Sequence, residues 1–399
     1  MLYGGDALAR RGDGKAVFIP YAVPGDRLLV RPRSEKKNYI RAEIIEILTP
    51  GDGRVTPVCT HFGKCGGCCW QQVEYSRQVE AKRLIFEELF RHHFPETAQL
   101  AIVMRPCPKP FGYRSRARLR RQLVSSRSEF QISESDSSNY EVVVGFFQSG
   151  SYFVEDIESC PLFRPCLNDA LSALRGLPFS PVPNDEINIA CSEEDGRWAI
   201  ANDDDREAQA RLLRRKVGEF TYNVTAGTFF QANDFMIDEL VSHVIGCVSP
   251  DPADTALDLF SGAGLFSLPL ARHFRAVTAV EYSRESHRLC VMNAAEAGIN
   301  NLKNIRADAA EWLDLHAASR FDCVVLDPPR AGVGPGIMEN VGRLASQEIV
   351  YVSCDPQTLV RDLERLDMNC WRIVSIEGFD MFPQTYHFET VVHLQRKSL

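Results

Sequence analysis

The amino-acid sequence predicts an α/β protein whose C-terminal half is a mostly parallel, doubly wound sheet of the Rossmann type. Strand-like apolar runs alternate there with helical segments such as 285–297 and 356–366; the runs lie at 255–259, 276–280, 321–326, 348–353, 371–376 and 389–395. Three of these runs end in turns with chemically reactive side chains. Open parallel sheets bind ligands beyond the carboxyl ends of their strands, so we expect a site there.

The composition is that of an ordinary soluble protein, with 45% hydrophobic and 25% charged residues in a chain of 399. No apolar run reaches the ~18 residues that a membrane span needs, and no secretory signal pattern is visible. The 13 cysteines are odd in number and scattered, which favours reduced thiols over a disulfide framework. We therefore expect a cytoplasmic monomer that is not bound to a membrane.

Three domains are predicted along the chain. Short strands with Pro-Gly and Gly-Asp turns indicate a small OB-type β-barrel over residues 1–53. Its first strand begins almost at residue 1, so an incomplete barrel is the alternative. Residues 54–222 form a central β-rich domain that contains one amphipathic helix at 73–94, expected to pack on the catalytic domain, and a polar hairpin tip at 125–139. Residues 223–399 form the doubly wound domain.

A glycine-containing turn follows the strand at 255–259, in the sequence Asp258-Leu-Phe-Ser-Gly-Ala-Gly264. Such glycines let the backbone approach a ligand at a helix N-terminus, although similar turns also serve as plain connections. Glu281 ends the next strand, where a carboxylate can accept both hydroxyls of a ribose, and Asp308 is placed to reach an adenine edge. The third glycine of a pyrophosphate loop is missing, so S-adenosylmethionine fits better than a dinucleotide.

Asp327 stands in a second reactive turn, Asp-Pro-Pro-Arg, which follows the strand at 321–326. The paired prolines stiffen this turn and remove two backbone donors, which fixes the Asp327 carboxylate at the mouth of the cleft. The alternative interpretation is a rigid loop whose aspartate caps a helix.

Cys354 ends the strand at 348–353 and faces the same cleft as Asp327, which makes its thiol a candidate nucleophile. Cys290 and Cys323, in contrast, have the pattern of small core residues. Glu389 and His387 lie at the start of the terminal strand and are candidates for a catalytic base, because a glutamate that faces the core at a strand start is rarely without a role.

Four motifs together resemble the RNA uracil-C5 methyltransferase family; they are Asp258-Leu-Phe-Ser-Gly-Ala-Gly264, Asp327-Pro-Pro-Arg-Ala-Gly332, Ser353-Cys-Asp-Pro-x-Thr-Leu-x-Arg-Asp362 and Phe382-Pro-x-Thr-x-His-x-Glu389. The resemblance implies that Cys354 adds to carbon 6 of uracil and that Glu389 removes the carbon-5 proton. It also implies contacts to S-adenosylmethionine from Gln231, Phe260, Glu281 and Asp327.

A cysteine-rich segment contains Cys59, Cys65 and Cys68, three thiols within reach of one centre. By residue type, the fourth ligand could be Cys69, Cys107, Cys160 or Cys166, and thiolates suit iron–sulfur or zinc equally. Family members with this spacing bind a 4Fe–4S cluster and take the fourth thiolate from a Cys-Pro pair downstream. The resemblance therefore implies a cluster with Cys160, and zinc is the alternative.

The segment 111–121 carries alternate arginines, Arg114, Arg116 and Arg118, which would form a basic stripe beside an aromatic pair. Such a stripe suits RNA phosphates and a stacked base, whereas the simpler interpretation is a solvated strand with ordinary ion pairs. The N-terminal barrel resembles a TRAM-type RNA-binding domain, and its basic face could likewise be either an RNA contact or plain surface; the residues are Arg31, Arg33, Lys36, Lys37 and Arg41.

The resemblance implies methylation of carbon 5 of a specific uridine in RNA. Members with the cluster and the barrel usually act on bacterial 23S rRNA, which makes 23S rRNA the expected substrate. The alternatives are a tRNA T-loop uridine methyltransferase, an amino-group methyltransferase with the same Asp-Pro-Pro turn, and a redox-sensing RNA-binding protein without turnover.

Overall fold

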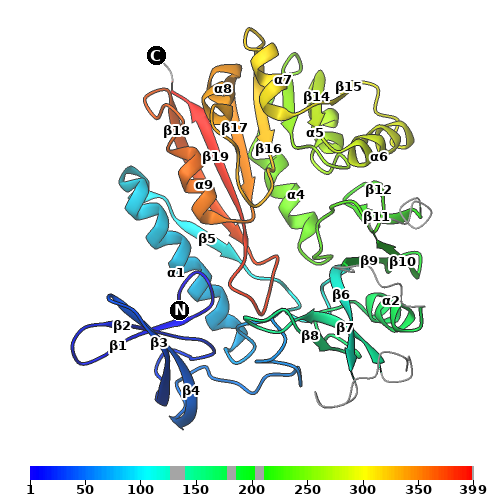
Figure 1. Ribbon diagram of the computed structural model, residues 1–399. Coiled ribbons are helices and arrows are strands. Elements are labelled where there is room, and N and C mark those ends of the chain that lie inside the picture. The colour runs from blue at the N-terminus through cyan, green and yellow to red at the C-terminus, as the bar shows by residue number, and fades with distance from the viewer. Residues whose placement is uncertain (126–139, 178–185, 203–210, 398–399) are drawn as a thin grey trace.

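The computed structural model describes residues 1–125, 140–177, 186–202 and 211–397. The hairpin tip expected at 125–139 lies, from residue 126 on, outside these residues. Figure 1 shows one large sheet with helices around it and two smaller sheets beside its lower end. No helix in the described ranges is both long and apolar enough to cross a membrane.

The large sheet has eight strands in the order β15-β14-β13-β16-β17-β19-β18-β5. Five of them run parallel, namely β13 (Thr255–Leu259), β14 (Ala276–Glu281), β15 (Leu302–Arg306), β16 (Phe321–Leu326) and β17 (Ala345–Ser353). β19 (Glu389–Arg396) lies antiparallel between β17 and β18 (Trp371–Phe379). The predicted α/β class is thus confirmed, with a mixed sheet.

Successive side chains of these strands enter two different cores, because neighbouring residues of a strand point to opposite faces. Ala256, Val325 and Val350 pack with α4 (Ile237–Gly246), α5 (Ser267–His273) and α6 (Arg284–Glu296). Leu257 and Val324 pack on the other face, with α7 (Ala309–Leu315), α8 (Ile337–Leu344) and α9 (Pro356–Leu363). Burial on both faces explains why the strands read as continuous apolar runs.

The central part of the chain also contributes to this large sheet. β5 (Ile102–Arg105) pairs parallel with β18 and forms the edge strand. α1 (Tyr75–His93) buries Phe86 and Phe90 against the second core, and the ring of Phe86 lies 5.4 Å from that of Phe388. A short 3-10 helix, η1 (Pro95–Gln99), joins α1 to β5. The helix expected at 73–94 is therefore present and packs against the large sheet.

The N-terminal sheet has four strands in the order β1-β2-β4-β3. They are β1 (Ala7–Arg10), β2 (Ala16–Ile19), β3 (Arg27–Glu35) and β4 (Tyr39–Thr49). Within residues 1–53, all of which are described, β1 and β3 form the two edges, so closure into a barrel stays a prediction. Arg31 and Arg33 both pair with Glu43, which offsets part of the basic face.

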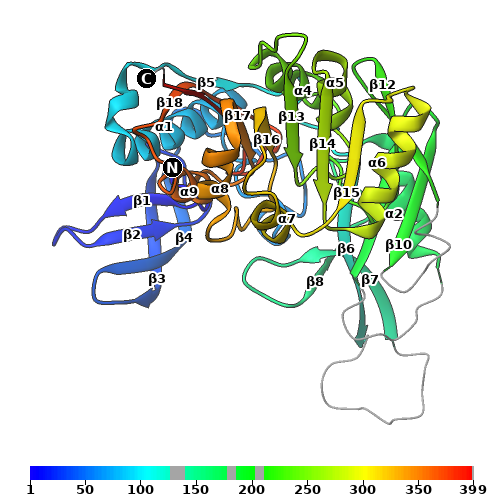
Figure 2. The same ribbon diagram turned by 90° about the horizontal axis from the view of Figure 1, so that it is seen from above.

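The five-stranded central sheet has the order β10-β9-β6-β7-β8. It consists of β6 (Arg116–Ser125), β7 (Tyr140–Phe147), β8 (Val154–Asp156), β9 (Glu186–Ser192) and β10 (Arg197–Asn202), and α2 (Pro165–Arg175) packs against it. The hairpin of β11 (Leu213–Val217) and β12 (Phe220–Val224) joins the first core of the large sheet. Figure 2 shows the N-terminal and central sheets on opposite sides below the large sheet.

Candidate active site

Cys354 and Glu389 are neighbours because of the strand register. Ser353, the last residue of β17, pairs with Thr390 of the antiparallel β19, and the Thr390 hydroxyl donates a hydrogen bond of 2.8 Å to the Ser353 carbonyl. One step further along both strands lie Cys354 and Glu389. The thiol is half-buried, whereas the Glu389 side chain is 2% exposed. A reachable thiol thus lies beside a buried carboxyl group.

Glu389 is poised to exchange a proton. Burial raises the pKa of Glu389 well above its usual value, and the nearby charge of Asp327 raises it further. Its Oε2 atom has no hydrogen-bond partner in the described part of the chain. A buried carboxyl oxygen without a partner is costly, so its retention suits a group that a substrate or proton will engage.

The thiol of Cys354 is protonated at rest. Burial raises its pKa to about 12, and the charges of Glu389 and Asp327 add to the effect. A thiol is a weak nucleophile until it loses its proton. The raised pKa therefore favours the less reactive form of Cys354 at neutral pH.

Asp327 follows β16, and burial raises its pKa to about 7. Arg330, three residues later, donates a hydrogen bond of 2.8 Å to the imidazole of His387. Burial and then the Arg330 charge lower the pKa of His387 to about 3, so this imidazole stays neutral near pH 7. So low a pKa makes the His387 imidazole a weak proton acceptor.

The turn after β13 is pinned to the end of β14. The Glu281 carboxylate accepts hydrogen bonds from the Gly262 N–H at 2.9 Å and the Ser283 N–H at 2.6 Å. Phe260 has a φ of 62°, in the left-handed region that costs a non-glycine residue free energy. At Gly264, with φ of 91°, a Cβ atom would lie 2.9 Å from the Cys290 sulfur, so only glycine fits.

Three buried polar atoms lack partners among the residues that the structure describes: Asp258 Oδ1 and Ser261 Oγ, which belong to β13 and its turn, and Gln231 Oε1. Burial raises the pKa of Asp258 to about 7. Asp308 caps α7 through its Oδ1 atom, which accepts from the Ala310 N–H at 2.9 Å. A ligand rich in amino and hydroxyl groups would satisfy such atoms. Sequence reasoning named Gln231 and Asp308 but missed Asp258 and Ser261, although both lie in the quoted motif.

The three predicted RNA-contacting arginines have different surroundings. Arg114 lines the cavity of the cysteine-rich segment. The Arg116 guanidinium donates to the carbonyls of Ala226, Thr228 and Phe230, and burial lowers its pKa to about 9. Only Arg118 of the three is exposed, and it pairs with Glu186 at 2.6 Å. The alternate spacing of the three arginines places them on one side of the strand, but neighbouring loops cover two of them.

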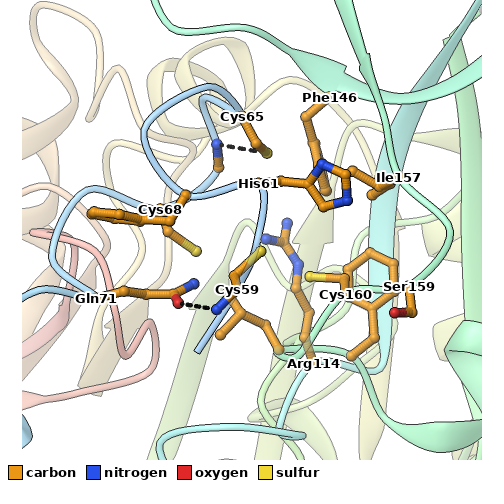
Figure 3. Close-up of a pocket in the computed structure, with 14 residues that line it drawn as sticks. Cys59, His61, Cys65, Cys68, Gln71, Arg114, Phe146, Ile157, Ser159 and Cys160 are labelled. Carbon is orange, nitrogen blue, oxygen red and sulfur yellow. Dashed lines mark hydrogen bonds between the residues drawn. The ribbon is translucent and has the colours of Figure 1, made fainter. Parts of the chain in front are cut away.

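Cys59, Cys65, Cys68 and Cys160 line one cavity, together with His61 and Arg114 (Figure 3). The other candidates for the fourth ligand lie elsewhere. Cys69 lies against Gly5, Cys107 against Asn233, and Cys166 against Cys191. The structure thus brings together the four cysteines that the resemblance selected.

A second thiol group was not foreseen from the sequence. The sulfurs of Cys166 and Cys191 and a carboxylate oxygen of Glu193 lie within 4.8 Å of one another. Glu193 already accepts from the Cys166 N–H at 3.1 Å and pairs with Arg164 at 3.5 Å. Its charge is therefore already compensated, which disfavours an additional cation.

Comparison with known proteins gives consistent results. A profile of the tRNA (uracil-5-)-methyltransferase family matches residues 204–397. The chain is 30% identical to the 23S rRNA (uracil(1939)-C(5))-methyltransferase RlmD of Enterobacter sp., over 98% of this chain and 94% of that protein. It is 29% identical to the protein of the same name from Alkalilimnicola ehrlichii, over 97% and 93% of the two chains.

A solved structure shares the whole fold. The crystal structure of Pyrococcus abyssi tRNA (uracil-54, C5)-methyltransferase, in complex with S-adenosyl-L-homocysteine, superposes with a TM-score of 0.72 at 22% identity. The match covers 98% of this chain and 99% of that one. With curated relatives aligned over nearly their full length, the sequence, the fold and the motifs agree: this chain belongs to the family of RNA uracil-C5 methyltransferases.

Proposed function

We propose that the protein uses S-adenosylmethionine to methylate carbon 5 of a uridine in 23S rRNA, with Cys354 as nucleophile and Glu389 as base. The observation that carries this proposal is the pairing of Ser353 with Thr390, which sets a half-buried thiol beside a buried carboxyl group. An enzyme that methylates an amino group needs neither residue.

The chemistry proceeds in two covalent stages. The Cys354 thiol passes its proton to the Asp327 carboxylate, which leaves Glu389 free to accept a proton later. The thiolate adds to carbon 6, which breaks the carbon 5–carbon 6 double bond and makes carbon 5 nucleophilic. S-adenosylmethionine supplies the methyl group that carbon 5 takes. Glu389 then removes the carbon-5 proton, the double bond re-forms, and the bond between carbon 6 and sulfur breaks.

The residues around the β13 turn would hold S-adenosylmethionine. Glu281 keeps lone pairs free for the ribose hydroxyls, and Asp308 keeps one carboxylate oxygen for the adenine edge. Gln231 and Asp327 would face the methionine part, and Phe260 the nucleoside. The unsatisfied atoms of Gln231, Asp258 and Ser261 support a polar ligand at this place.

Two variants test the mechanism. Cys354→Ala is expected to abolish methyl transfer and tritium release from carbon-5-labelled uridine RNA, while Cys370→Ala, which removes a thiol far from the site in sequence, should not. Glu389→Gln is expected to transfer the methyl group and then stall, which leaves a protein–RNA adduct that survives denaturing electrophoresis. Normal turnover by Glu389→Gln without an adduct would show that Glu389 is not the base.

The choice of 23S rRNA over tRNA rests on the relatives named as 23S rRNA methyltransferases and on the cysteine cavity. Transfer RNA is the second candidate, favoured by the name of the structural neighbour. Mapping 5-methyluridine in 23S rRNA and tRNA from cells with and without the gene decides between them. Loss of the modified base from tRNA alone would contradict our choice.

We also propose that Cys59, Cys65, Cys68 and Cys160 hold a 4Fe–4S cluster, which would cross-link two distant segments of the central domain. Tetrahedral zinc keeps its thiolates about 3.8 Å apart. Among the described residues, no three of these four sulfurs lie within 4.8 Å of one another. This wider spacing supports the larger inorganic core over zinc.

Protein purified without oxygen is expected to be brown and to contain about four iron atoms per chain. Cys160→Ser should lose the colour and the iron, whereas Cys166→Ser, six residues away, should keep both. Colourless protein that contains zinc after anaerobic purification would overturn the cluster assignment.

A further inference from the structure

The loop 380–388, which joins β18 to β19, delivers Glu389 to the active site. Figure 1 shows it extending from the large sheet toward the two smaller sheets. Gln384 within it has a φ of 70°, a left-handed conformation that a non-glycine residue keeps only when its surroundings hold it. The conformation of the loop is therefore set by contacts from elsewhere in the chain.

We propose that Gln78 of α1 is a positioning residue for Glu389, acting through a reciprocal pair of hydrogen bonds with Gln384. This inference rests on the proposed role of Glu389 as the base. The Gln78 amide nitrogen donates to the Gln384 side-chain oxygen at 2.9 Å, and the Gln384 backbone N–H donates to the Gln78 side-chain oxygen at 2.9 Å. Gln78 is 1% exposed and Gln384 2% exposed.

Gln78 also ties the loop to the segment that follows the cysteine cavity. Its amide nitrogen donates to the carbonyls of Trp70 and Val73, at 3.0 and 2.8 Å. In return, the backbone N–H groups of Cys69 and Trp70 both donate to the Gln384 carbonyl at 3.1 Å. One buried amide thus joins α1, the residues after Cys68 and the loop that carries the base.

The carbonyls of three successive loop residues are all held from the N-terminal third of the chain. Lys82 donates to Phe382 at 3.1 Å, the Tyr113 hydroxyl donates to Pro383 at 3.1 Å, and Cys69 and Trp70 donate to Gln384. A hydrogen bond lost in this dry interior leaves its buried partner unsatisfied, which is costly, so these contacts hold the loop backbone in place.

The position of the Glu389 carboxylate depends on this backbone. Its Oε2 atom has no partner in the described residues, so no side-chain bond to that oxygen fixes it before substrate binds. Gln384 lies only five positions before Glu389. A shift of the loop would therefore move the base while leaving Cys354, which belongs to the β17 end, in place. Displacement by about 1 Å can slow a proton transfer on the order of 100-fold.

The test is Gln78→Met, which keeps the volume of the side chain and removes its hydrogen bonds. We expect methyl transfer to carbon 5 to remain within about threefold of wild type, while release of the methylated RNA slows 10- to 100-fold, by the cost of misplacing a base. A denaturation-resistant adduct should therefore accumulate, as in Glu389→Gln but more weakly, with S-adenosylmethionine affinity unchanged.

Gln72→Met is the matched control. Gln72 lies in the same segment and is 2% exposed, but its side-chain amide has no hydrogen-bond partner among the described residues. The same chemical change there should produce no adduct. Gln384→Met removes the bond between the two side chains but keeps the backbone N–H bond from position 384 to Gln78, and it also keeps the Gln78 bonds to Trp70 and Val73. It should therefore produce a weaker adduct of the same kind if Gln78→Met fails to fold.

The outcomes distinguish a failure of the positioning role of Gln78 from a failure of Glu389 as the base. An adduct in Glu389→Gln and in the Gln78 or Gln384 variant supports the positioning role. An adduct in Glu389→Gln alone, or equal slowing of methyl transfer and release, means that Gln78 is merely structural and overturns it. If Glu389→Gln itself forms no adduct, the proposed base is wrong and the positioning role falls with it.

Discussion

Burial and the charges of Glu389 and Asp327 raise the pKa of the Cys354 thiol to about 12. A raised pKa leaves less thiolate at any pH below it, so alkylation of the free enzyme should be slow at pH 7. The rate at Cys354 should climb about tenfold per pH unit through pH 10, without a plateau.

Mass spectrometry of iodoacetamide-treated protein measures this rate at each pH. The same peptide in the urea-unfolded chain provides the control, because its thiol should reach a plateau near pH 9, above the usual pKa of about 8.5. A plateau below pH 9 in the folded enzyme would show that the site activates the thiol without substrate.

The raised pKa of Asp327 leads us to expect that the affinity for S-adenosylmethionine depends on pH. Burial raises its pKa to about 7, so it is largely protonated at pH 6 and largely ionised at pH 8. The ionised form attracts the sulfonium of S-adenosylmethionine, so affinity should rise with pH across this window, by up to about tenfold. Calorimetric titration at pH 6 and at pH 8 measures the affinity for S-adenosylmethionine.

S-adenosylhomocysteine lacks the sulfonium charge and should bind with a weaker pH dependence. Asp327→Asn should also flatten the dependence for S-adenosylmethionine, because its amide does not titrate. Equal pH dependence of the two ligands would mean that another group, such as Asp258, governs the effect.

At the scale of elements, α1 acts as part of the catalytic core. Phe86 is fully buried on the face that meets Phe388, Met104 and the large sheet, whereas Leu84 is 49% exposed on the opposite side. Phe86→Ala should lower the free energy of unfolding by about 3–5 kcal/mol, and Leu84→Ala by less than about 0.5 kcal/mol. Urea unfolding followed by circular dichroism checks both values.

The strands of the large sheet could be predicted from sequence because they are buried on both faces. The runs at 255–259 and 321–326 coincide with β13 and β16. β5 could not be predicted as part of this sheet, because its four residues carry little signal and its partner β18 lies far along the chain. Register between distant strands is a property of the whole packing.

The candidate site likewise contains some features that could be predicted from the sequence and others that could not. Cys354, Asp327 and Glu389 follow or begin strands within specific motifs, so their convergence could be predicted. The Gln78–Gln384 pair could not, because a glutamine on a helix carries no sign of a partner 306 positions away. Alternation likewise gave the side of the strand for Arg116, but not the 226–230 loop that covers it.

At the scale of the whole molecule, Arg118 offers an exposed positive charge on the central sheet. Arg118→Glu should weaken binding to an RNA substrate and reduce the slope of log affinity against log salt by about one, because one phosphate contact is lost. Arg288→Glu, the same change on the exposed side of α6, should leave both quantities unchanged. Filter binding at several salt concentrations measures them, and an unchanged slope for Arg118→Glu would show a plain solvated strand.

The edge position of β5 has a consequence for biosynthesis. Ile102 pairs with Ile376, so this strand emerges from the ribosome 274 residues before its partner exists. At ~5–20 residues per second that delay is roughly 15 to 55 s. Meanwhile the apolar face of α1 and an unpaired strand stay uncovered, the kind of surface that chaperones bind. Translation of β18 and β19 ends this vulnerable interval and, in the same step, brings Glu389 beside the end of β17.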